Sequence, residues 1–219
     1  MHRNARPVRL IDLLDRETAD LHREVDNELL ASPVSPREYQ RYLARTYGFV
    51  APIERSITTT PAIERYADLR RFSKEELLRR DLLALHYTTH QIDQLPQCSV
   101  PLFDTPADAL GWAFFIERST LSHPAVFRHL ASCIPGEVAF ASSYLKCYVG
   151  SIGEMWRGFS ESLDMLASEV EAARQQVIEA ARTAFRFHQR WRSQCVSDRA
   201  STSGVLRLSR IAADDDVVS

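Results

Sequence analysis

Apolar residues that recur at intervals of three and four are the feature that most constrains the fold of this chain. Hardly any segment alternates apolar and polar residues as a half-buried strand does, and the chain has only 7 glycines. The clearest series would form one buried stripe on a helix: Val170, Ala173, Val177, Ala180, Ala184, Phe187 and Trp191. The sequence therefore predicts an all-α, single-domain bundle of helices.

Capping residues and prolines predict where the helices begin and end. Thr105 with Pro106 is a strong start signal, and Ser73 with Glu76 has the spacing of a capping box. Two helices with a proline inside them are expected: one from residue 35 with a kink at Pro52, and one from residue 105 with a bend near Pro124. Further helices are expected over 8–30, 73–85, 137–149 and 151–166 and from residue 168, and a loop is expected over 88–104.

One domain accounts for most of the chain. A chain of 219 residues can bury about 70% of its unfolded surface in a single core. We expect this domain to span residues 1–192. Residues 193–219 are polar and end in DDDVVS, which predicts a poorly ordered C-terminal tail.

Charge and cysteine content exclude several classes of function. A formal net charge of −2 gives no electrostatic reason to expect nucleic acid or an anionic membrane as a partner. No apolar run approaches the roughly 20 residues of a membrane span, and the N-terminus lacks the apolar core of a secretory signal. The cysteines, Cys98, Cys133, Cys147 and Cys195, show no CxxC spacing. Free thiols in a cytoplasmic protein are expected.

Several segments resemble one protein family. The segment from Ala109 to Leu130, ALGWAFFIERSTLSHPAVFRHL, is similar to the distal helix of bacterial heme oxygenases, where ALGxLYVxEGSxLGG crosses over the heme. Thr18, His22 and Asp26 resemble the setting of that family's proximal histidine. Residues 39–54, 142–166 and 177–185 match the family in the same order. The chain thus resembles biliverdin-producing heme oxygenases over residues 8–192, which implies their helical fold.

The resemblance implies a ligand and a reaction. Heme would be both substrate and cofactor, and would be opened to biliverdin, carbon monoxide and ferrous iron with electrons from a ferredoxin or a reductase. A phytochrome could use the product. His22 would bind the heme iron, Arg157 a heme propionate, and Phe185 would belong to the heme-binding residues. By its position alone, His22 equally fits a partly buried helix histidine.

The distal segment departs from the family where backbone approaches the heme. Arg118, Ser122 and His123 replace its three glycines on the catalytic side. Three hypotheses therefore remain open. The chain could be an active heme oxygenase. It could bind heme or another tetrapyrrole without cleaving it, for sensing, storage or transport, with His123 as a second iron ligand or pointing to solvent. It could also be a helical interaction module without heme.

Overall fold

The all-α prediction is confirmed. The computed structural model describes residues 8–21, 29–30 and 32–214, with side chains described as far as Cys195. No strand occurs among these residues. The helices are α1 (Leu10–Glu17), α3 (Pro36–Thr58), α4 (Lys74–Ala84), α5 (Thr89–Asp93), α6 (Pro106–Ser119), α7 (His123–Cys133), α8 (Pro135–Phe140), α9 (Ile152–Glu169) and α10 (Ala173–Asp214), with 3₁₀ turns η1 (Ile63–Arg65) and η2 (Leu69–Arg71).

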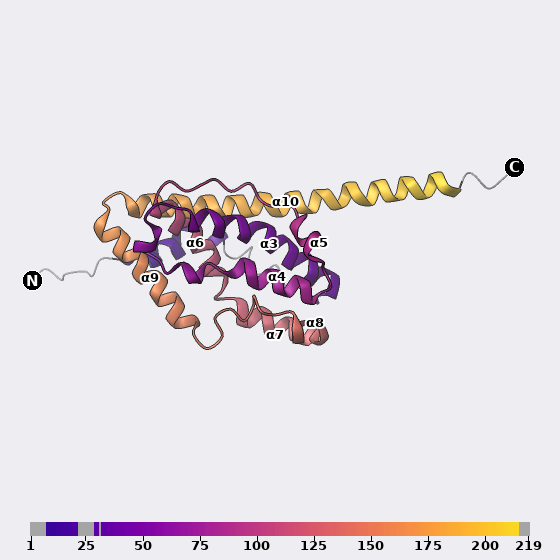
Figure 1. Ribbon diagram of the computed structural model, residues 1–219, viewed down its shortest axis with the longest axis horizontal. Coiled ribbons are helices and arrows are strands. Elements are labelled where there is room, and N and C mark those ends of the chain that lie inside the picture. Colours follow the sequence, from indigo (N-terminus) through magenta and orange to yellow (C-terminus); the bar gives the residue numbers. More distant parts are fainter. Residues whose placement is uncertain (1–7, 22–28, 31, 215–219) are drawn as a thin grey trace, which may run out of the picture.

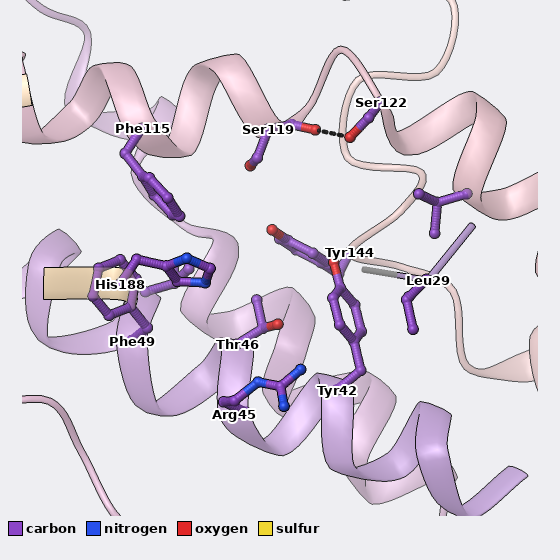
Figure 2. A pocket seen from close by; sticks show the side chains of 12 residues that line it. Leu29, Tyr42, Arg45, Thr46, Phe49, Phe115, Ser119, Ser122, Tyr144 and His188 are labelled. Atoms are coloured by element: carbon purple, nitrogen blue, oxygen red, sulfur yellow. Dashed lines mark hydrogen bonds between the residues drawn. The ribbon is translucent and has the colours of Figure 1, made fainter. Parts of the chain in front are cut away.

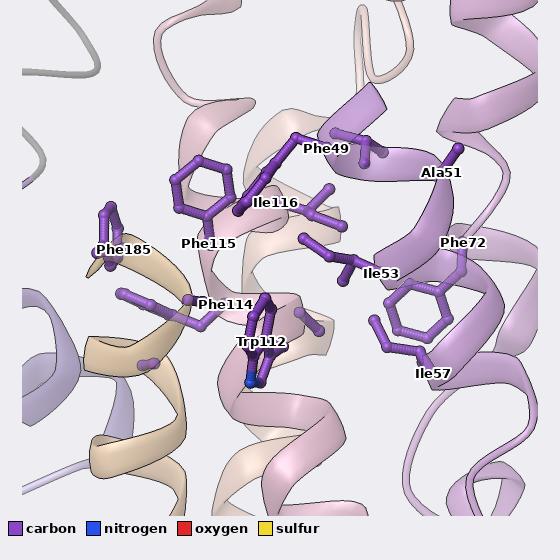
Figure 3. Packing of buried hydrophobic residues seen from close by; sticks show 14 of the residues in the cluster. Phe49, Ala51, Ile53, Ile57, Phe72, Trp112, Phe114, Phe115, Ile116 and Phe185 are labelled. Atoms are coloured by element: carbon purple, nitrogen blue, oxygen red, sulfur yellow. The ribbon is translucent and has the colours of Figure 1, made fainter. Parts of the chain in front are cut away.

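Helix α6 is the centre of the bundle. It is buried over nearly its whole circumference, as expected for a helix that is apolar on all sides. It packs against α10 on one side and α3 on another. Figure 3 shows its aromatic residues Trp112, Phe114 and Phe115 between Phe185 of α10 and the apolar side chains of α3.

A glycine permits the close contact of α6 with α10. A Cβ atom on Gly111 would lie 2.5 Å from the Cβ of Ala180 and 2.6 Å from the carbonyl oxygen of Val177. Ala173, Val177, Ala180 and Ala184 are buried in the core, so this part of the stripe predicted from the sequence faces inward. Small residues on both helices therefore set their separation.

Helix α3 begins and continues as its sequence predicts. Ser35 forms a capping box with Glu38, and Pro36 occupies the first turn. The helix runs on through Pro52, whose ring removes the N–H that would bond to the carbonyl of Gly48. The backbone N–H of Cys98 donates to that carbonyl instead, at 2.8 Å. The loop after α5 thus replaces the lost helical hydrogen bond.

The capping box expected at Ser73 is absent. The Ser73 side chain makes no capping hydrogen bond. Glu54 of α3 caps α4 instead: its carboxylate accepts from the backbone N–H of Lys74 at 2.9 Å and of Glu75 at 2.7 Å. An acid at a helix N-terminus satisfies unpaired N–H groups and interacts favourably with the helix dipole.

Two helices are shorter than the sequence predicts. Helix α1 ends at Glu17, where the backbone leaves helical geometry at Thr18, whose hydroxyl donates to the carbonyl of Leu14 at 2.7 Å; residues 19–21 are helical again. Helix α8 ends at Phe140, where a helix to residue 149 was expected. The carboxylate of Asp81 accepts from the N–H groups of Ser143 and Tyr144 at 2.7 and 2.9 Å, which stabilises turns in this segment.

The last helix is longer than predicted. Helix α10 lies along the bundle, and its C-terminal part extends beyond it (Figure 1). The backbone is helical from residue 193 to 214, in the segment whose composition predicts a poorly ordered tail. The boundary between a domain and a tail at residue 193 stays a prediction. Among the described residues, no helix has the length and apolar composition that crossing a membrane requires.

Candidate functional site

A cavity lies where α6, α7, α3 and α10 meet (Figure 2). Side chains from all four helices line it, together with three residues from connecting segments. The described lining residues are Leu29, Tyr42, Arg45, Thr46, Phe49, Val50, Phe115, Ser119, Ser122, Val126, Tyr144 and His188.

The walls are chemically suited to a flat, mainly apolar ligand with charged groups at one edge. Most of the lining is aromatic or aliphatic, and Arg45 supplies a positive charge. A second, more polar hollow shares Leu29, Tyr42 and Arg45 with the cavity and adds Arg41 and Glu38. The cavity therefore adjoins a polar surface that contains two arginines.

The cavity is narrow between the described side chains. Its empty volume is about 580 Å³, part of which is open to solvent. The described side chains leave only narrow gaps within it, so a ligand of several fused rings would have to move the walls apart.

Two small serines form the part of the cavity wall where α6 ends. Ser119 and Ser122 line the cavity, and their hydroxyls donate to carbonyls one turn earlier, those of Ile116 at 2.7 Å and Ser119 at 2.8 Å. Figure 2 shows the bond between Ser122 and Ser119. Both side chains are small, so they add little bulk to the wall. Each hydroxyl proton is bonded to a backbone carbonyl, so the serines also add little unpaired polarity.

One histidine in the cavity lacks a hydrogen-bond partner. The ring of His188 packs against Phe49 and Phe115 with centroids 5.0 and 4.7 Å away, and its Nδ1 atom is buried with no hydrogen-bond partner among the described residues. Burial, with a smaller effect of Arg192 and Arg45, lowers the pKa of His188 to about 3. The ring is therefore neutral at physiological pH.

A buried ion cluster fixes α6 on its other side. Glu117 is two residues from Phe115 and Ser119, so it points nearly opposite to the cavity. Its carboxylate accepts from Lys74 Nζ and from the Tyr148 hydroxyl, both at 3.0 Å. Burial by itself favours neutral Lys74, but Glu117 and Tyr148 outweigh it and raise the pKa of Lys74. The cluster ties α6 to α4 and to the segment after α8.

The comparisons with known proteins agree with this arrangement. The family model described as heme oxygenase matches residues 8–194, most of the chain. The chain belongs to the heme oxygenase family. No curated protein matches it in sequence.

A solved structure shows the same heme oxygenase fold. It is the NO- and CO-bound heme oxygenase from Neisseria meningitidis, which superposes with a TM-score of 0.70 at 22% sequence identity. The match covers 86% of this chain and 92% of that one. At this identity the likeness shows the fold, and the site must be argued from the residues of this chain.

Arg118, at the first lost glycine position of the heme oxygenase pattern, points away from the cavity. Its Nε donates to the carboxylate of Asp15 on α1 at 3.1 Å, and Arg118 is not among the described lining residues. Burial raises the pKa of Asp15, although Arg118 partly offsets that effect. The arginine therefore joins α6 to α1 and leaves the cavity free of its side chain.

His123, at the third lost glycine position, is buried outside the cavity. It is 3% exposed, its ring centroid lies 4.6 Å from that of Tyr144, and its Nδ1 lies 3.7 Å from the sulfur of Cys147. Its Nε2 has no partner among the described residues. Burial and, to a smaller degree, Lys74 lower the pKa of His123 to about 3. His123 thus neither points to solvent nor lines the cavity.

None of the other predicted heme oxygenase site residues that the structure describes lines the cavity. Arg157 is exposed on α9 and is absent from the described lining. Phe185 is buried behind the wall, where it contacts Phe115 with ring centroids 4.9 Å apart. His22 lies outside the described residues, so its predicted role as iron ligand stays a prediction.

His188 was not among the site residues predicted from the sequence. It lies four residues after Ala184 and three before Trp191, so it falls on the face of the predicted buried stripe. A histidine at a stripe position was the available signal. Which side of the stripe faces a cavity becomes visible only when α10 is packed against α6 and α3.

Proposed function

We propose that this protein binds heme in the cavity and opens the ring to biliverdin, carbon monoxide and ferrous iron. The observation that carries the proposal concerns the three replaced glycines. Only Ser122 lines the cavity, whereas Arg118 pairs with Asp15 and His123 is buried elsewhere. The bulky side chains of Arg118 and His123 therefore stay out of the cavity, and of the three replacements only the small side chain of Ser122 forms part of its wall.

The described residues fit heme by their chemistry. Aromatic and aliphatic side chains suit the porphyrin faces, and Arg45 with Arg41 suits carboxylates at its edge. On the basis of the family resemblance we propose that His22 would hold the heme iron, and that Arg45 would pair with a propionate. Bound heme would supply both the iron at which oxygen is activated and the ring that is cleaved.

The protein's own residues would orient the ligand and exclude water. Phe49, Phe115 and Tyr144 would cover its apolar surface, and Ser119 and Ser122 would allow backbone to approach it. Electrons would come from a ferredoxin or a reductase, and a phytochrome could use the biliverdin. The four cysteines are free thiols, which supports a cytoplasmic location.

A hemin titration followed by reduction tests the proposal. We expect a Soret band on titration, and growth of a broad biliverdin band after ascorbate or a reductase is added. Titration without a spectral change would rule out heme binding and leave a helical interaction module. Heme that stays intact under reductant in air would rule out cleavage.

A pair of variants tests the location of the site. Ser122→Leu places a bulky side chain in the cavity and should weaken hemin binding by about tenfold or more, which is about 1.4 kcal/mol. Arg118→Leu changes a neighbouring residue that points away from the cavity and should leave hemin affinity almost unchanged. Equal effects of the two variants in a fluorescence-quenching titration would contradict this placement.

One observation favours a second candidate function, heme binding without cleavage for sensing, storage or transport. The cavity contains a neutral imidazole with an unpartnered nitrogen, that of His188. A second imidazole on the iron would slow oxygen binding.

A further inference from the structure

We propose that His188 is an iron ligand of the bound heme. The inference rests on the proposed heme binding and assigns a role to a residue of α10 outside the matched distal and proximal segments. It also replaces His123 as the candidate for a second axial imidazole.

The first argument is position. His188 is among the residues that line the cavity, and Figure 2 shows its ring pointing from α10 into the space bounded by Phe115, Thr46 and Tyr144. An axial ligand must reach the iron from within the porphyrin site, and His188 is the described histidine that lines this cavity.

The second argument is the unpartnered nitrogen. Buried polar atoms in folded proteins nearly always have a hydrogen-bond partner, and a buried one without a partner needs an explanation. Nδ1 of His188 has none among the described residues. A ring nitrogen without a competing hydrogen bond leaves the imidazole available to a metal ion.

Packing fixes the position of the imidazole. Edge-on and tilted contacts join it in one cluster with Phe49 and Phe115, which also contact each other. One turn later, the indole N–H of Trp191 donates to the carbonyl of Arg45 at 3.0 Å, which anchors α10 to α3. The imidazole is therefore held by packing before any ligand binds, and the entropy lost on coordination is small.

His123 is a natural control because it is a buried histidine like His188 but does not line the cavity. It is also buried, neutral and short of one hydrogen-bond partner. It does not line the cavity, and its ring packs on Tyr144 instead. A spectroscopic change specific to His188 can therefore be attributed to the cavity rather than to loss of a buried imidazole.

The test is the spin state of the ferric heme complex of the full chain, by visible absorption and electron paramagnetic resonance. We expect wild type and His123→Ala to be low-spin. His188→Ala should still bind hemin but become high-spin, and an excess of free imidazole should restore the low-spin spectrum by entering the space left by the side chain. If oxygen must wait for His188 to leave the iron, His188→Ala should also cleave heme faster.

The outcomes separate this inference from the proposed function. Absence of any Soret change in wild type would overturn heme binding and the inference with it. A high-spin wild-type complex, or a low-spin His188→Ala complex without added imidazole, would overturn the inference alone. Should His188→Ala fail to fold, His188→Phe keeps the aromatic packing and cannot bind iron, so it must be high-spin.

Discussion

Two buried histidines show how one residue type takes two positions according to its surroundings. His188 and His123 are both desolvated, and each has a ring nitrogen without a hydrogen-bond partner among the described residues. The neighbours of His188 are rings of the cavity wall, whereas those of His123 are Tyr144 and Cys147. His188 lines the cavity, and His123 does not.

Burial of His123 predicts a pH-dependent stability. Its pKa falls from 6.5 to about 3 in the folded state. The unfolded chain therefore takes up a proton first, and stability is lost as the pH falls from about 6.5 towards 3. The free energy of unfolding should fall by about 1.4 kcal/mol per pH unit from this residue.

His123→Leu isolates that contribution, since it keeps a buried side chain of similar size without a titrating group. Urea unfolding at several pH values between 6 and 4 should show a slope about 1.4 kcal/mol per pH unit shallower than in wild type. Parallel curves would mean that His123 binds protons equally well in both states.

At the scale of the helices, the contact of α6 with α10 positions the site. Phe115 and Ser119 on α6 and His188 on α10 form part of one cavity wall. Their separation depends on Gly111, where an added Cβ atom would lie 2.6 Å from the carbonyl oxygen of Val177. The helix pair therefore determines the width of the cavity.

Gly111→Ala should destabilise the protein by about 1–3 kcal/mol, because the added Cβ overlaps the carbonyl of Val177 and forces α6 away from α10. Gly158→Ala is a matched control in the middle of α9, where a Cβ meets nothing within 4 Å. The control should gain about 0.5–1 kcal/mol from helix propensity. Chemical denaturation compares the two, and equal effects would contradict close packing at Gly111.

For the whole molecule, the site requires elements that are far apart in the chain. The cavity takes residues from α3, the α6–α7 turn, Tyr144 and α10. The part of α10 up to Cys195 contributes to the core, and the remainder extends beyond the bundle (Figure 1).

A chain that ends at Cys195 should keep the stability of the full chain within about 0.5 kcal/mol and give the same spectrum with hemin. A chain that ends at Arg186 lacks His188 and Trp191 and should lose both stability and the hemin spectrum. Thermal unfolding and hemin titration measure these effects. A large loss in the longer truncation would mean that residues after Cys195 belong to the folded unit.

The local parts of this fold were predictable from the sequence. The starts at Ser35 and Thr105 were predicted because the capping hydrogen bonds join residues three apart, to Glu38 and Asp108. The start of α4 at Ser73 was also predicted, but not its capping, because the carboxylate of Glu54 caps it from another helix. The end of α8 was placed too late, since the carboxylate of Asp81 stabilises turns after it. The helix expected over 8–30 is interrupted at Thr18, and its residues 22–28 lie outside the described part of the chain.

The sequence by itself determined the all-α class, most of the helix starts and the resemblance to heme oxygenases, because apolar spacing, capping and motifs are properties of neighbouring residues. Only the tertiary structure decided that Arg118 and His123 turn away from the cavity while Ser122 and His188 line it. Side-chain direction depends on where α6 ends and how α10 packs against it. Those contacts join residues far apart in the chain, so no local pattern encodes them.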